Sequence, residues 1–103
     1  MGFQPEKEIS AQELAERLQR GEVLNIVDVR EDMEWEEGHI RGAKHIPLGQ
    51  LPERYGELDS EKEWFVVCRS GGRSGLACEL LSEVGYDAVN MTGGLLSWRG
   101  ELV

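Results

Sequence analysis

The chain has 103 residues, 40% of them hydrophobic and 30% charged, a composition typical of one folded globular domain. Its 20 acidic and 11 basic residues give a formal charge of −9, which argues against nucleic acid or an anionic membrane as a partner. No apolar run reaches the length of a membrane span, and the first residues lack the features of a signal peptide. Glu6 occupies the position where myristoylation of Gly2 requires Ser or Thr. We therefore expect one cytoplasmic domain covering residues 1–103.

The first half of the chain alternates between strand-like and helix-like patterns. Ser10 and Glu13 have the spacing of a capping box, which predicts the start of a helix over residues 11–20. Residues 24–29 form a near-continuous apolar run that ends in polar residues, as a buried parallel strand does. The remaining predicted elements are a short strand at 7–9, a short helix at 32–37, a short strand at 44–46 and helical turns at 48–58.

The second half continues the alternation. Residues 64–67 predict a strand, and apolar residues at helical spacing from Ser74 to Val84 predict a helix that ends at Gly85. A strand at 88–91, a Gly-Gly turn and a short helix at 95–98 follow. Strands that alternate with helices predict an α/β fold, with a small parallel sheet covered by helices on both faces.

The segment from Cys68 to Arg73 joins the predicted strand at 64–67 to the helix after it. A cysteine at the carboxyl end of a strand lies where open α/β sheets bind their ligands. Glycines let backbone N–H groups turn toward a common point, and the helix directs the positive end of its dipole there, so a thiolate would be stabilised. Arg69 and Arg73 add two positive charges, which predicts an anionic substrate. The residues alone leave two alternatives: a buried core cysteine, and a phosphate-binding loop without chemistry.

A second motif lies upstream, in Val27-Asp-Val-Arg30, Glu34-Trp-Glu-Glu-Gly-His-Ile-Arg-Gly-Ala43 and Ile46-Pro47. Taken with the cysteine loop, the late Gly-Gly pair and Trp98, its order and spacing closely resemble the single-domain rhodanese (thiosulfate sulfurtransferase) family. The resemblance covers nearly the whole chain. It implies a parallel sheet of about five strands and a catalytic cysteine that carries a persulfide. Carried onto this sequence, it implies that Cys68 is the nucleophile and that the substrate cradle is Arg69, Ser70, Gly71, Gly72 and Arg73.

The resemblance also implies a reaction. The Cys68 thiolate would take the outer sulfur from thiosulfate or a small persulfide, and a thiol or cyanide would then remove it, without a metal or organic cofactor. The expected partners are a small anionic donor and a thiol or cyanide acceptor. One alternative is a persulfide carrier or interaction module that delivers its sulfur to a partner protein. A further alternative is an anion sensor without turnover, which would tolerate Cys68→Ser.

The length of the loop argues against a related class of enzymes. Cysteine-dependent phosphatases place five residues between the cysteine and the arginine that binds phosphate, whereas four separate Cys68 from Arg73. The shorter loop makes a smaller cradle, and the loop contains no aspartate to act as an acid. A phosphatase or arsenate reductase is therefore the less favoured interpretation.

Three residues near the loop are candidates for a supporting role: Asp28, Arg30 and Ser74. Asp28 and Arg30 lie at the carboxyl end of the predicted strand at 24–29. We expect Arg30 to pair with Glu34 on the next turn, and Asp28 to accept hydrogen bonds from loop backbone or from an arginine. A carboxylate beside the nucleophile would raise the pKa of the nucleophile, so a supporting role is favoured over a catalytic one.

Other reactive side chains are given structural interpretations. Nothing in the resemblance makes His39 or His45 catalytic, and two histidines without a third ligand are poor evidence for a metal site. Cys78 is interpreted as core filling rather than as a resolving cysteine. Trp98 is interpreted as core packing or as a cover for the loop. Arg41, Lys44 and Arg99 are candidates for a basic rim around the loop.

Overall fold

Strands and helices alternate along residues 7–103, the part of the chain that the computed structural model describes. The strands are β1 (Lys7–Ser10), β2 (Asn25–Asp28), β3 (Lys44–His45), β4 (Glu63–Val67) and β5 (Asp87–Thr92). The helices are α1 (Ala11–Gln19), α2 (Asp32–Glu37), α3 (Leu51–Arg54) and α4 (Gly72–Glu83), and 3-10 turns are formed by η1 (Leu48–Gln50), η2 (Tyr55–Glu57) and η3 (Leu95–Ser97). The predicted elements are confirmed to within two residues of their ends. The prediction that the chain starts with neither a signal peptide nor a myristoylation site lies outside the described residues.

The strands form one parallel sheet in the order β1-β5-β4-β2-β3, which confirms the predicted α/β class. In this strand order, the chain moves from β2 to its outer neighbour β3, and it moves from β4 in the opposite direction to β5. The gap between β2 and β4 is therefore a topological switch point, where open α/β sheets bind ligands at the carboxyl ends of their strands. Asp28 pairs with Val67 at this edge, so the residue after Val67, Cys68, lies at the switch point.

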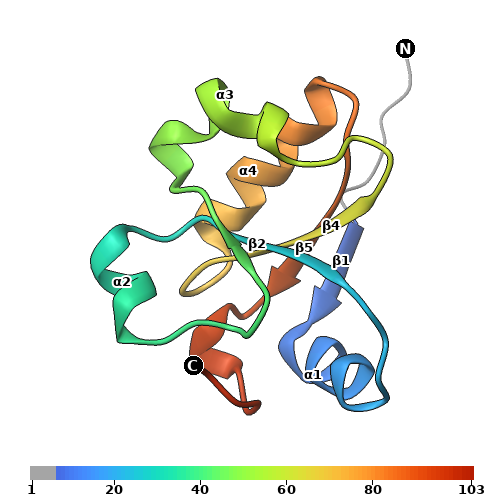
Figure 1. Ribbon diagram of the computed structural model, residues 1–103, viewed down its shortest axis with the longest axis vertical. Helices are drawn as coiled ribbons and strands as arrows, with labels where there is room; N and C mark the ends of the chain where they lie inside the picture. Colours follow the sequence, from blue (N-terminus) through green and yellow to red (C-terminus); the bar gives the residue numbers. More distant parts are fainter. Residues whose placement is uncertain (1–6) are drawn as a thin grey trace.

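Helices cover both faces of the sheet (Figure 1). On one face α3 and α4 pack over a buried cluster that includes Val27, Val66 and Leu81. On the other face α1 packs over a cluster that includes Leu14 and Phe65. Adjacent strand residues such as Phe65 and Val66 thus belong to different faces, as the alternation of side chains along a strand requires.

The two longer helices begin at different kinds of cap. In α1 the Ser10 hydroxyl accepts the backbone N–H of Glu13 at 3.0 Å, as the capping box predicts. The predicted start of α4 at Ser74 is wrong by two residues, because the helix begins at Gly72. Gly71 precedes it with φ +108°, a conformation that glycine adopts without strain, and the chain therefore turns into the helix earlier.

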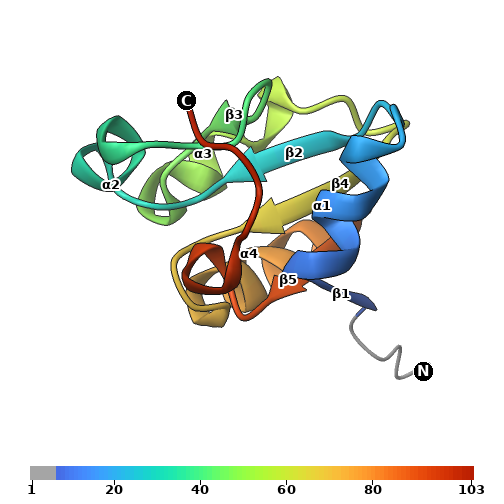
Figure 2. The ribbon, with the colours of Figure 1, turned by 90° about the horizontal axis from the view of Figure 1, so that it is seen from below.

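The C-terminal segment runs past α1 toward the loop that follows α2 (Figure 2). Val103 and His39 exchange two backbone hydrogen bonds, at 3.0 and 2.8 Å, which fix the end of the chain. Within residues 7–103, no helix combines the length and apolar character needed to cross a membrane.

Candidate active site

The sulfur of Cys68 lies inside a ring of hydrogen-bond donors. The backbone N–H of Gly71 points at Sγ from 3.0 Å, and the backbone N–H of Ser74 does so from 3.3 Å. The Ser74 hydroxyl oxygen is also 3.3 Å from Sγ. These donors come from the tight turn after β4 and from the first turn of α4, whose dipole directs its positive end toward the sulfur. Cys68 itself has 0% of its surface exposed.

Burial and hydrogen bonding act in opposite directions on the Cys68 thiol. Burial alone raises the pKa of Cys68, because it disfavours the charged thiolate. The hydroxyl of Ser74 and the backbone N–H groups of Ser74, Gly71 and Ser70 together outweigh burial and bring the pKa below its ordinary value. The loop therefore favours the thiolate, which is the nucleophilic form of cysteine.

A buried polar network supports this ring from the side of β5. The Ser74 hydroxyl lies 2.5 Å from Asn90 Oδ1 and 3.1 Å from the carbonyl oxygen of Gly71. Asn90 Nδ2 donates to the same Gly71 carbonyl at 3.3 Å. The hydroxyl has one proton and three acceptors in reach, counting the Cys68 sulfur, so a thiolate competes with Asn90 for that proton.

Sequence reasoning missed Asn90. In the sequence, Asn90 is a lone amide between the apolar residues Val89 and Met91 of a predicted strand. In the structure it is buried, with 6% of its surface exposed. A buried amide requires hydrogen-bond partners, and this requirement is evidence that β5 faces a polar site.

The loop also has a close neighbour in the turn after β5. Leu95 N–H donates to the Cys68 carbonyl at 2.9 Å, and Leu96 N–H donates to the Arg69 carbonyl at 3.0 Å. A Cβ placed on Gly94 would lie 2.2 Å from the Arg69 carbonyl oxygen, so only glycine fits there. The late Gly-Gly pair therefore lets η3 dock against the start of the loop.

The two loop arginines have different surroundings. Arg73 donates two hydrogen bonds to the Glu34 carboxylate, at 2.7 and 2.8 Å, and the hydrogen bonds from Arg73 lower the pKa of Glu34 to about 2. Arg69 is exposed, and among residues 7–103 its side chain makes no hydrogen bond or ion pair. Sequence reasoning missed the role of Glu34, which lies in α2 and is 39 residues from Arg73.

Comparison with known proteins identifies the family to which the chain belongs. A family model for the rhodanese-like domain matches residues 10–101. The chain belongs to the rhodanese-like domain family. YtwF of Bacillus subtilis, provisionally named a sulfurtransferase, is 46% identical over 95 residues, 92% of either chain. A protein of Allochromatium vinosum named sulfurtransferase is 36% identical over 92 residues, covering 88% of this chain and 86% of its own.

A solved structure agrees with the family match. The crystal structure of a rhodanese-like domain protein from Staphylococcus aureus superposes with a TM-score of 0.88 and 37% identity, covering 94% of this chain and 96% of its own. The family and the names of the relatives support sulfur transfer in general for this rhodanese-like domain.

The predicted pairing of Arg30 in this rhodanese-like domain is wrong. Arg30 donates from its backbone N–H and its guanidinium to the carboxylate of Asp28, at 2.9–3.0 Å, and not to Glu34. Residues i and i+2 of an extended chain point the same way, so the two side chains meet. The prediction that Asp28 accepts from an arginine is confirmed, and Arg30 further donates to the Gly38 carbonyl at 2.7 Å. The buried pair thus holds the segments on either side of α2.

The histidines of the rhodanese-like domain pack on an aromatic ring. His39 and His45 both stack on Trp35, with ring centroids 3.5 and 4.7 Å apart. His39 Nδ1 donates to the Trp35 carbonyl, and His45 Nε2 donates to the carbonyl of Arg30. Neither histidine has a hydrogen bond to the cysteine loop.

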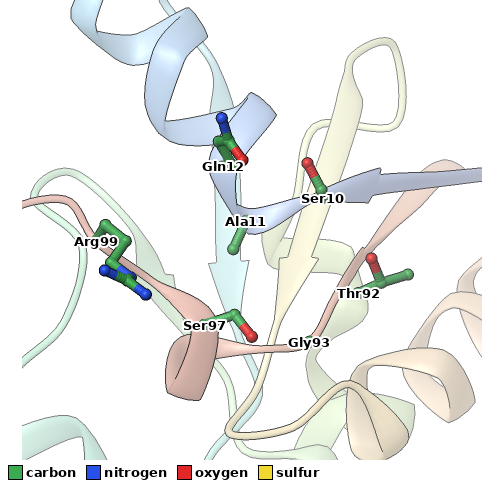
Figure 3. A pocket seen from close by; sticks show the side chains of 7 residues that line it. All are labelled: Ser10, Ala11, Gln12, Thr92, Gly93, Ser97 and Arg99. Carbon is green, nitrogen blue, oxygen red and sulfur yellow. The ribbon is translucent and has the colours of Figure 1, made fainter.

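The remaining candidates lie in separate places. Cys78 is 1% exposed in the core on the α4 face, as its interpretation as filling requires. Trp98 packs against the core on the α1 face rather than over the loop. Arg41 pairs with Glu101 at 3.0 Å. Arg99 lines a hollow at the carboxyl ends of β1 and β5, together with Ser10, Gln12, Thr92 and Ser97 (Figure 3).

Proposed function

We propose that the chain transfers a sulfane sulfur from thiosulfate or an organic persulfide, through a persulfide on Cys68, to a thiol or cyanide. The observation that carries this proposal is the ring of donors around a cysteine sulfur. Two backbone N–H groups and the Ser74 hydroxyl converge on Sγ, which is the arrangement needed to hold a negative sulfur. A cysteine that only filled the core would have no use for them.

The first half of the reaction charges the enzyme. The Cys68 thiolate attacks the outer sulfur of the donor, and the donor's S–S bond breaks with its electron pair leaving on sulfite or on a thiolate. A new S–S bond joins Sγ to the transferred sulfur, which carries the negative charge of the persulfide. Donors of the loop stabilise this charge because their dipoles are already oriented before the reaction.

The second half of the reaction removes the sulfur from the Cys68 persulfide. A thiolate or cyanide attacks the terminal sulfur, the bond to Sγ breaks, and Cys68 returns as the thiolate that the loop stabilises. Because the first product, sulfite or a thiolate, leaves before the acceptor reacts, ping-pong kinetics are expected. Cys68 has no exposed surface, so a donor reaches Sγ only when the residues around it move aside. The reactive thiol must also stay reduced, which supports a cytoplasmic location.

Intact-protein mass spectrometry tests the proposal. After incubation with thiosulfate or with an alkyl persulfide, we expect wild type and Cys78→Ser to gain one sulfur atom, and Cys68→Ser to gain none. Cyanide should remove the sulfur and release thiocyanate in equal amount. Absence of any gain on wild type with both donors would contradict the proposal.

The acceptor decides between the enzyme and the carrier. Discharge by small thiols at a rate that sustains turnover supports a sulfurtransferase. A Cys68 persulfide that forms but persists in the presence of small thiols would instead support a carrier for a partner protein. An anion sensor would bind thiosulfate without any gain of mass.

A further inference from the structure

Glu34 neutralises one of the two positive charges of the loop, that of Arg73. Its carboxylate receives two hydrogen bonds from the Arg73 guanidinium, and its Oε1 also accepts the backbone N–H of Glu31 at 3.0 Å. The side chains of Glu34 and Arg73 are 24% and 33% exposed, so water screens this pair only in part. The fixed geometry of a bidentate arginine–carboxylate pair makes it stronger than an ordinary surface contact.

Arg73 immediately precedes Ser74, whose backbone N–H lies 3.3 Å from the Cys68 sulfur, so the first turn of α4 holds the Arg73 charge near that sulfur. The hydrogen bonds that Arg73 donates to Glu34 raise the pKa of Arg73 most, and the negative charge of the Cys68 thiolate raises it further. The guanidinium thus interacts with the sulfur electrostatically. With Glu34 ionised, the pair has no net charge, and the exposed Arg69 supplies the remaining positive charge of the loop.

The positive charge that remains in the loop affects which sulfur donor binds more tightly. Thiosulfate carries two negative charges, whereas the persulfide of an uncharged alkyl thiol carries at most one. A dianion gains more than a monoanion from each additional positive charge in the site, so cancelling Arg73 disfavours thiosulfate relative to the persulfide.

We propose that Glu34 is a specificity-determining residue: by neutralising Arg73, it makes the loop prefer organic persulfides to dianionic donors such as thiosulfate. Glu34 acts through Arg73 and touches no reacting atom, so it is a positioning residue. The inference rests on the proposed function, because it concerns which donor charges Cys68.

Glu34→Gln tests the inference with little change of shape, because a glutamine oxygen can still accept a hydrogen bond from Arg73. We expect the ratio of kcat/KM for thiosulfate to kcat/KM for a persulfide of an uncharged alkyl thiol to rise about fivefold. The gain should come from a lower KM for thiosulfate and should shrink as salt is added. Glu36→Gln is the matched control, since Glu36 is exposed on the same helix, and it should leave the ratio unchanged.

The double variant Glu34→Gln/Arg73→Gln separates charge from structure. It removes both charges, so the ratio of kcat/KM for thiosulfate to kcat/KM for the persulfide should return to the wild-type value. If the change in Glu34→Gln came instead from a disordered loop, the altered ratio would persist in the double variant. An equal loss on both donors in Glu34→Gln, or a ratio insensitive to salt, would overturn the inference. If neither donor adds sulfur to wild-type Cys68, the proposed function itself fails, and this outcome is distinct from an unchanged ratio.

Discussion

Ser74→Ala removes the only side-chain hydroxyl that reaches the Cys68 sulfur among the described residues; the thiol donates to its oxygen, and a thiolate would accept its proton. The Ser74 oxygen is 3.3 Å from Sγ, and the two backbone N–H groups at 3.0 and 3.3 Å remain in the variant. A hydrogen bond to a charged group contributes about 1.5–3 kcal/mol. Because two donors remain, we take the lower end, which corresponds to a pKa of Cys68 raised by about one unit.

The pH dependence of Cys68 alkylation measures this change. The pKa of Cys68 in the wild type is below its ordinary value, so its alkylation rate should level off at a lower pH than that of Ser74→Ala. Below both pKa values the variant should react about tenfold more slowly, because one pKa unit is a tenfold change in thiolate. Above both values the two rates should be close. Cys78 is buried, and its replacement by serine in both proteins leaves one reacting thiol.

Ser82→Ala is the matched control, since Ser82 is exposed on the same helix. The variant Ser74→Ala also leaves Asn90 Oδ1 without the hydroxyl at 2.5 Å, so its free energy of unfolding should fall by about 1–3 kcal/mol. An alkylation pKa equal to that of wild type, in a variant that remains folded, would refute the role assigned to the hydroxyl.

Three further predictions address the rest of the structure. The pKa of Glu34 is lowered to about 2, so its pair with Arg73 contributes stability above about pH 5 that is lost as the pH falls toward 2. Glu34→Gln should lower the free energy of unfolding by about 1–2 kcal/mol near neutral pH, and urea titrations should show this difference vanish near pH 2. Gly94→Ala places a Cβ 2.2 Å from the Arg69 carbonyl oxygen, so it should cost more than about 2 kcal/mol and abolish persulfide formation on mass spectra; a variant of unchanged stability would contradict the close packing. Cys78→Ala should lower stability by about 1 kcal/mol in the same titrations while sulfur transfer continues, and loss of transfer in the folded variant would argue for a redox role.

Local sequence was sufficient for the elements and for the place of Cys68 at the end of β4. The strand, Cys68 and the glycine-rich turn are continuous in the chain, so their geometry follows from backbone preferences over about ten residues. Only the start of α4 was misjudged, because Gly71 lets the chain turn into the helix two residues earlier than Ser74. The upstream motif resembles that of the rhodanese family, and this resemblance predicted the parallel sheet of about five strands.

The partners of the loop were decided by the tertiary structure. Glu34 meets Arg73 across 39 residues, and Asn90 meets Ser74 across 16, because β2 and β5 both lie beside β4. No local pattern encodes which strands are neighbours. The expected pair of Arg30 with Glu34 failed for two reasons: Arg30 lies in extended chain, where it meets Asp28, and Arg73 occupies the Glu34 carboxylate.

The sequence by itself thus determined where the sulfur of Cys68 lies and which backbone surrounds it. The tertiary structure alone decided how much charge that sulfur experiences, since Asn90 shares the Ser74 proton and Glu34 cancels the charge of Arg73. The physical reason is that the backbone geometry of a short turn is local, whereas the electrostatic field at a buried atom sums over every charge that folding brings near it.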